Sequence, residues 1–177
     1  MKNLSFILYL ISAILYFLIL KEVVFTYNFF PNSTFFILAS LYLIFGYTLI
    51  VNNIRWQFIT YLLSLLVILF YRRSEVGFNF EFYLLDWLPY ITKNKIVMFN
   101  IIGNILIFIP MGMYTKNIFI GLLFIISVEL LQVFLERGMF DIVDIVLNFI
   151  GFAIGSLEVT IWRKMIKKEK TSMMILK

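Results

Sequence analysis

The sequence predicts an all-α fold, a polytopic transmembrane helical bundle of about six spans, with five spans as the alternative. The first observation is composition: the 177 residues are 63% hydrophobic and 14% charged, and the mean hydropathy is +0.99. Soluble domains carry about 25% charged residues, and a soluble chain of this length cannot bury so many apolar side chains. The second observation is that the apolar residues fall into runs of about the length that crosses a bilayer.

Six apolar runs account for most of the chain. The first run is too long for the hydrophobic part of a signal peptide and lacks a small-residue cleavage site after it, so it is expected to remain as a span. The second follows Pro31-Asn32-Ser33-Thr34, a helix-start signal, and the third closes at Arg72-Arg73. The six runs are residues 4–20, 35–51, 56–71, 96–114, 118–135 and 142–162.

The segment 72–95 is the longest polar stretch, yet it is rich in Phe, Tyr and Trp. A solvated linker would not be so aromatic. We expect this segment to lie on the membrane surface or to fold back over helix ends.

Glycine and proline mark two of the later runs. Pro110 and Gly112 are expected to kink or end the fourth helix. Gly151 and Gly155, four residues apart in the sixth run, permit close helix packing.

The basic residues predict the orientation in the membrane. Six spans place both termini on one side, and that side carries more Lys and Arg than the other, mainly through the tail after Trp162. The positive-inside rule therefore predicts a multi-pass protein of the cell membrane with both termini in the cytoplasm. The tail is expected to contact anionic lipid, and nucleic acid is not expected as a partner. The predicted regions are 1–71, with no recognised motif, the core 72–157 and the tail 158–177.

The chain has neither Cys nor His. Disulfides, thiolate metal sites and nucleophile systems that need an imidazole are therefore excluded. Any acid–base chemistry would depend on carboxylates, Lys, Tyr or bound water.

The polar residues inside the last three runs follow helical spacing. Asn100 and Asn104 are at i, i+4, and Glu129 and Gln132 are at i, i+3. Because neighbouring antiparallel helices alternate in direction, these groups and those at the start of the sixth run are expected to converge at one level of one leaflet. The last set lies on one helix face and consists of Asp141, Asp144 and Asn148.

Burying an ionisable side chain at this depth costs a few kcal/mol unless the side chain is paired or hydrated. The presence of both Glu129 and Asp144 therefore favours a functional role over a purely structural one. These two are the candidates for a catalytic role, although none is assigned. The structural alternatives are that the amides only link helices and that Asp141 is a helix N-cap. The predicted ligand-binding residues are Asn104, Glu129, Gln132, Arg137, Asp141, Asp144 and Asn148.

Three ordered motifs resemble the VanZ-like family. The first runs from Asn104 through Phe108 and Pro110 to Gly112, and the second is Ser127-x-Glu129-x-x-Gln132-x-Phe134. The third runs from Arg137 through the acidic residues to Gly151 and Gly155. Within these motifs we assign structural roles to Phe108, Pro110, Gly112, Gly151 and Gly155.

The resemblance implies a small bacterial envelope protein, since the family's named member is associated with low-level resistance to teicoplanin, a lipid-bearing glycopeptide. Our first hypothesis is a polar cavity that binds a lipid-linked cell-wall precursor, a lipoglycopeptide or another lipid-like ligand, with Arg137 on its anionic group. One alternative is an enzyme that acts on a polyprenyl-phosphate or lipid substrate through paired carboxylates and a divalent cation. The other alternative is a transporter or a membrane scaffold.

Overall fold

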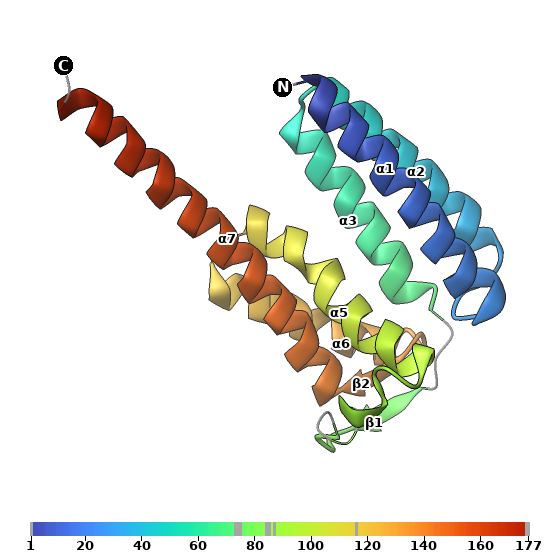
Figure 1. Cartoon of the computed structure of the whole chain (residues 1–177). Helices are drawn as coiled ribbons and strands as arrows, with labels where there is room; N and C mark the ends of the chain where they lie inside the picture. Colours follow the sequence, from blue (N-terminus) through green and yellow to red (C-terminus); the bar gives the residue numbers. More distant parts are fainter. Residues whose placement is uncertain (1, 73–75, 84–85, 87, 116, 176–177) are drawn as a thin grey trace. The chain divides into compact units, whose positions relative to one another are not determined.

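The computed structural model describes residues 2–72, 76–83, 86, 88–115 and 117–175 (Figure 1). It is 77% helical, and the all-α prediction is confirmed. Each predicted run corresponds to one helix. The helices are α1 (Lys2–Lys21), α2 (Ser33–Ile50), α3 (Ile54–Phe70), α5 (Lys95–Tyr114), α6 (Ile118–Phe134) and α7 (Ile142–Ile175).

The remaining elements are short. A π-helical turn, Glu22–Thr26, extends α1, and a 3₁₀ turn, Leu88–Tyr90, precedes α5. Strands β1 (Gly77–Asn79) and β2 (Met139–Asp141) pair in a two-stranded sheet. Helix α7 runs well beyond the predicted end at residue 162, through most of the basic tail.

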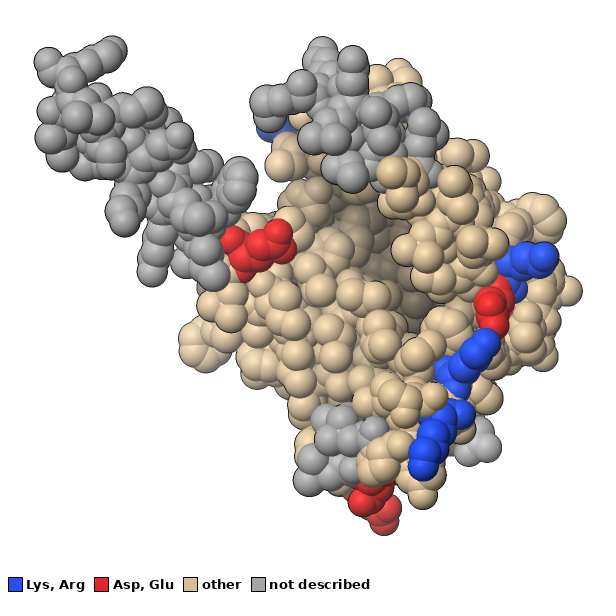
Figure 2. All heavy atoms as spheres, in the orientation of Figure 1, with Lys and Arg blue, Asp and Glu red and all other residues tan. Residues whose placement is uncertain are grey.

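Among the described residues, three helical stretches are long and apolar enough to cross a membrane: α2, α5 and Ile142–Val159 of α7. At a rise of 1.5 Å per residue, 18–20 residues span about 27–30 Å, the thickness of the hydrocarbon core. Helices α3 and α6 are apolar but have 17 residues each. The face drawn in Figure 2 is mostly uncharged, and large apolar side chains such as Phe119 and Leu123 are exposed, as expected of surfaces that face lipid.

Asparagine and aspartate side chains cap four of the helices, which explains where those helices begin. Asn94 Oδ1 accepts from the N–H groups of Ile96 and Val97, and such caps satisfy backbone donors that the first helical turn leaves open. The other three caps are Asn53 on α3, Asn117 on α6 and Asp141 on α7.

The chain divides into two compact units. Unit 1 comprises Met1–Phe78 and Leu130–Phe140, and unit 2 comprises Asn79–Glu129 and Asp141–Lys177. In unit 1, α1 and α2 run antiparallel: Tyr9 donates to the Tyr42 carbonyl at 3.1 Å, and Tyr16 donates to the Leu38 carbonyl at 3.2 Å. A Cβ on Gly46 would lie 2.1 Å from the Tyr9 ring, so a larger residue there would require the Tyr9 side chain to move.

In unit 2, α5 and α7 run side by side in the same direction (Figure 1). A Cβ on Gly151 would lie 2.0 Å from the Ile105 carbonyl oxygen, and one on Gly155 would lie 2.0 Å from the Ile109 carbonyl oxygen. On the facing helix, Gly112 approaches the Phe152 carbonyl oxygen in the same way. The two backbones are therefore as close as glycine allows. This contact fixes the rotation of α7 and with it the direction of the α7 polar side chains.

The fourth predicted run forms one helix, α5, which contains Pro110 and ends at residue 114, the predicted end of the run. Because proline lacks an N–H, it removes one hydrogen bond to the preceding turn. Phe108 beside it is fully buried, and it packs within 6.4 Å of the Phe124 ring of α6, centroid to centroid.

Candidate functional site

One face of α7 carries three polar residues, and each is hydrogen-bonded to a different neighbouring segment of unit 2. Asp141, Asp144 and Asn148 follow the i, i+3, i+7 spacing that places side chains on one helix face. Their partners come from the segment before α5, from α5 and from α6 respectively. The polar face of α7 is thus the centre of the candidate site.

The middle position links α7 to α5. Asn104 Nδ2 donates to Asp144 Oδ1 at 2.5 Å. Asn104 is buried, whereas Asp144 is only partly buried. A hydrogen bond to a charged acceptor is stronger than one between neutral groups, so this pair fixes the Asp144 carboxylate, while the residue as a whole is partly exposed.

The deepest position links α7 to α6. Asn148 Nδ2 donates to Glu129 Oε1 at 3.3 Å, and the two residues are 1% and 2% exposed. Because the amide nitrogen points at the carboxylate, the amide oxygen points elsewhere. Asn148 Oδ1 is buried and accepts no hydrogen bond from the described residues. Buried polar atoms of this kind are rare in folded proteins and call for an explanation.

The first position, Asp141, caps the N-terminus of α7 and also binds the segment before α5. Its Oδ1 accepts from the Val143 N–H at 2.8 Å, as the structural alternative for this residue predicts. Its Oδ2 accepts from the Tyr83 hydroxyl and from Asn79 Nδ2. Both carboxylate oxygens are therefore engaged, and the segment that holds Asn79 and Tyr83 is fastened to the start of α7.

Two predicted site residues lie in unit 1. Gln132 is buried, and its Nε2 donates to the Leu69 carbonyl at 2.8 Å, one of the carbonyls that the end of α3 leaves open. Arg137 is exposed in the turn after α6, where its N–H donates to the Gln132 carbonyl at 2.7 Å. For both residues, ligand contact stays a prediction.

The turn that holds Arg137 has the hydrogen bonds of a Schellman motif, with bonds from Arg137 to Gln132 and from Glu136 to Val133. The residue at its left-handed position is Glu136, with φ of 55°. Glycine adopts this conformation at lower cost. The turn is therefore held by its hydrogen bonds against a small backbone penalty.

The three carboxylates of the site do not form a metal-ion cluster. Across the described part of the chain, no three acidic side chains come together as potential ligands. Each carboxylate instead accepts from an amide or hydroxyl donor.

A family model for VanZ/LLP1 matches residues 58–163 of the chain. The chain belongs to the VanZ/LLP1 family. The resemblance inferred from the three motifs is confirmed. Family membership and the apolar helices together identify the chain as a membrane protein. Searches of curated proteins and of solved structures give no match.

The match covers α5, α6, the polar face of α7 and the segment between α3 and α5, so the geometry above belongs to the VanZ/LLP1 region. Within this region, sequence reasoning missed Asn79 and Tyr83. The sequence pointed to these two residues only through the aromatic content of segment 72–95, which predicted that the segment lies on the membrane surface or folds back over helix ends. The structure bears out the fold-back, since Tyr83 and Ile91 also pack against Ile101, Val143 and Leu147.

The environment of Tyr83 favours its neutral form. Burial raises the pKa of the Tyr83 hydroxyl above its ordinary value of about 10, as do the hydrogen bond to Asp141 and the charges of Asp141 and Asp144. The hydrogen bond with Asn79 lowers the pKa, but the raising effects dominate. The folded state thus favours the protonated Tyr83 hydroxyl. The contribution of this hydroxyl to the stability of the protein is complete below pH 10 and is lost as the pH rises further.

Tyr83→Phe removes the donor to Asp141 and leaves the ring in place. We expect it to cost about 1–2 kcal/mol, because the acceptor is charged and buried but Tyr83 is only partly buried. Amide hydrogen exchange at residues 79–83 should become faster, and the loss of stability above pH 10 should shrink. Tyr90→Phe is the control, since Tyr90 is exposed. Equal exchange rates in the wild type and Tyr83→Phe would contradict the fastening role.

Proposed function

We propose that this VanZ/LLP1 protein is a multi-pass protein of the bacterial envelope with both termini in the cytoplasm. Its polar α7 face lines an intramembrane site for a lipid-linked or lipid-like ligand. Through that ligand, the protein lowers susceptibility to teicoplanin-type lipoglycopeptides. The bilayer lipids are its constant partners, and the ligand is a cell-wall precursor or the lipoglycopeptide itself.

The observation that carries this proposal is the buried pair of Glu129 and Asn148. The carboxylate lies in an otherwise apolar helix at 2% exposure, where burial of an ionisable group is costly and usually functional. The Asn148 amide oxygen beside it accepts no hydrogen bond from the described residues. A pair that only joined helices would be expected to satisfy all its polar atoms, so the open acceptor supports a ligand.

The other two positions of the α7 face support complementary roles. Asp144 is held by Asn104 and remains partly exposed, so it is suited to direct contact with the ligand. Asp141 has both oxygens engaged, so it is suited to positioning the start of α7. We therefore assign the ligand contacts of α7 to Asp144 and Asn148.

The test is teicoplanin and vancomycin susceptibility of a sensitive Gram-positive host that expresses the wild type, Glu129→Gln or Asp144→Asn at equal membrane levels. The wild type should reduce susceptibility to teicoplanin selectively, and both variants should lose the effect. Ser127→Ala is the matched control on α6, because among the described residues the Ser127 hydroxyl donates to the Leu123 carbonyl of its own helix, and it should behave as the wild type.

Two outcomes would contradict the proposal. If the wild type leaves teicoplanin susceptibility unchanged, the resistance role fails. If the wild type is active but both variants match it, the polar α7 face is not the site.

A further inference from the structure

In unit 2, the described residues from Asn79 to the start of α5 have an inner side that contacts the helices and an outer side that is exposed. The inner side is fixed: Asn79 and Tyr83 bond to Asp141, and Tyr83 and Ile91 pack on the starts of α5 and α7. The outer side is aromatic and exposed, with Phe80 at 66%, Phe82 at 52% and Tyr90 at 56%. We call residues 79–83 the strap.

The inner and outer residues of the strap are separated by local backbone geometry. Asn79 Oδ1 accepts from the Glu81 N–H at 3.0 Å, a turn that asparagine commonly makes. With Asn79 and Tyr83 held against Asp141, Phe80 and Phe82 are left on the outer side. The exposure of two large rings is therefore a consequence of the bonds that fasten the strap.

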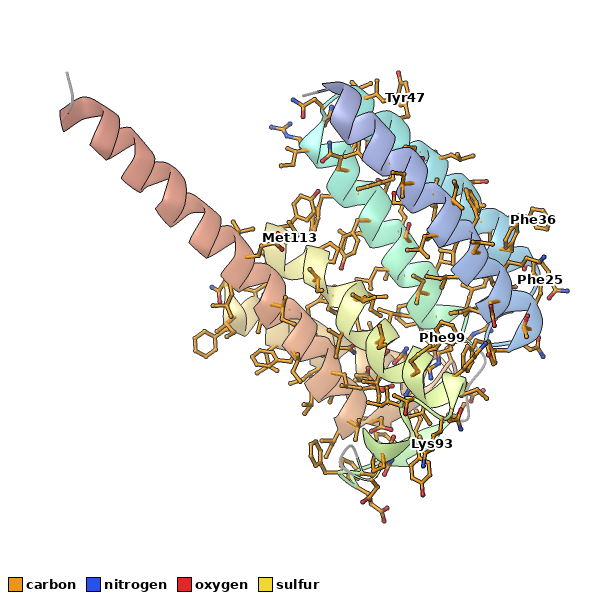
Figure 3. All side chains as sticks on the ribbon, in the orientation of Figure 1. Phe25, Phe36, Tyr47, Lys93, Phe99 and Met113 are labelled. Carbon is orange, nitrogen blue, oxygen red and sulfur yellow. The ribbon has the colours of Figure 1, made fainter. Side chains whose placement is uncertain are left out.

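The level of the strap in the membrane follows from the helices to which it is fastened. Helices α5 and α7 run parallel: Ile105 contacts Gly151 and, four residues further along each helix, Ile109 contacts Gly155. If both cross the bilayer, their starts lie at the same membrane surface. In Figure 3, Lys93 lies beyond the start of α5 and Met113 lies near the other end of that helix. The strap therefore lies at the headgroup level of one leaflet.

Exposed aromatic rings at this level have a suitable environment in the lipid. Aromatic side chains are favoured at the boundary between headgroups and acyl chains, whereas a cluster of exposed rings in water marks an interaction surface. Within residues 79–95 the charges do not select a lipid, because Glu81 and Asp86 balance Lys93 and Lys95. The rings, and not net charge, would then drive the contact.

We propose that the strap is an interfacial anchor, in which Phe80 and Phe82 insert into the headgroup–acyl boundary of the leaflet at the starts of α5 and α7. The partner is the phospholipid leaflet, whether zwitterionic or anionic. Because the same strap holds Asp141 on its inner side, lipid contact and the order of the start of α7 are linked. The lipid headgroups then lie next to the part of α7 that carries Asp144.

The test uses single cysteines, since the chain has none of its own. Nitroxide labels at Phe80→Cys, Phe82→Cys and Glu81→Cys are compared in the full-length protein, reconstituted in phosphatidylcholine and in phosphatidylglycerol bilayers. Collision with oxygen reports lipid exposure, and collision with a water-soluble nickel chelate reports water exposure. We expect the oxygen-to-nickel ratio to be severalfold higher at positions 80 and 82 than at the exposed position 81, in both lipids.

Leu106→Cys is the reference for a spanning helix, because Leu106 is 57% exposed in the middle of α5. Its label should show the highest oxygen-to-nickel ratio of all. Equal nickel access at positions 80, 81 and 82 would overturn the anchor. The same holds if the pattern appears only in the anionic bilayer, since charge would then drive the contact. A water-accessible label at position 106 would overturn the spanning topology on which the anchor depends.

A second copy of the chain is the rival occupant of the aromatic surface. It would shield positions 80 and 82 from nickel as lipid does, but it would bring labels together. Spin–spin broadening that grows with the protein-to-lipid ratio would therefore overturn the lipid assignment. The absence of broadening together with high oxygen access supports it. A failed susceptibility test would leave this result unaffected, because the anchor is measured without any ligand.

Discussion

Gly151→Ala is expected to be among the most destabilising single methyl additions in unit 2. The new Cβ would lie 2.0 Å from the Ile105 carbonyl oxygen and 2.8 Å from its carbon. The obstacle is backbone, so no side-chain rotation relieves the clash, and α5 and α7 must separate. Overpacking of a close-packed interior costs about 1–3 kcal/mol, and we expect the upper end of that range or more.

The measurement is the unfolding temperature of the purified protein in detergent, followed by the loss of the monodisperse peak on size exclusion. Gly155→Ala should reproduce the effect, because its Cβ would meet the Ile109 carbonyl oxygen at the same distance of 2.0 Å. Gly103→Ala is the matched control on α5: outside the backbone of its own helix, no described residue lies within 4 Å of its Cβ position, and alanine is the better helix former. An unfolding temperature for Gly151→Ala equal to that of Gly103→Ala would contradict the close α5–α7 contact.

Helical periodicity explains why much of the candidate site could be predicted. The i, i+3, i+7 spacing of Asp141, Asp144 and Asn148 depends only on the geometry of one helix, and it is found as predicted. The alternating direction of neighbouring helices brings Asn104 to Asp144 and Glu129 to Asn148. Apolar runs likewise predicted all six helices, because burial or lipid exposure is a property of each run by itself.

The features that could not be predicted depend on contacts between distant segments. Tyr83 meets Asp141 across 58 residues of chain, and no periodicity specifies the path of the strap. Gly112 was assigned to a motif from sequence, but only the structure identifies the Phe152 carbonyl as its neighbour.

Exchanging the partners of the buried pair should distinguish a ligand site from a helix link. In Asn148→Asp, two carboxyl groups face each other where both residues are almost fully buried. A buried charge without compensation costs about 3–5 kcal/mol, so we expect little folded protein. Adding Glu129→Gln places the amide donor on α6 and the carboxylate acceptor on α7. The double variant should therefore regain the monodisperse peak and most of the unfolding temperature.

Function should not return with the fold. The exchange preserves one hydrogen bond between α6 and α7, but it moves the charge to α7 and removes the amide oxygen that accepts no bond from the described residues. If that oxygen and the Glu129 carboxylate contact the ligand, the folded double variant will remain as susceptible to teicoplanin as cells without the protein. If the double variant restores both folding and the teicoplanin phenotype, the pair only holds the helices together, and the ligand site must be sought elsewhere in the protein. Because folding and susceptibility are both measured on the wild type, Asn148→Asp and the double variant, loss of structure cannot be mistaken for loss of the site.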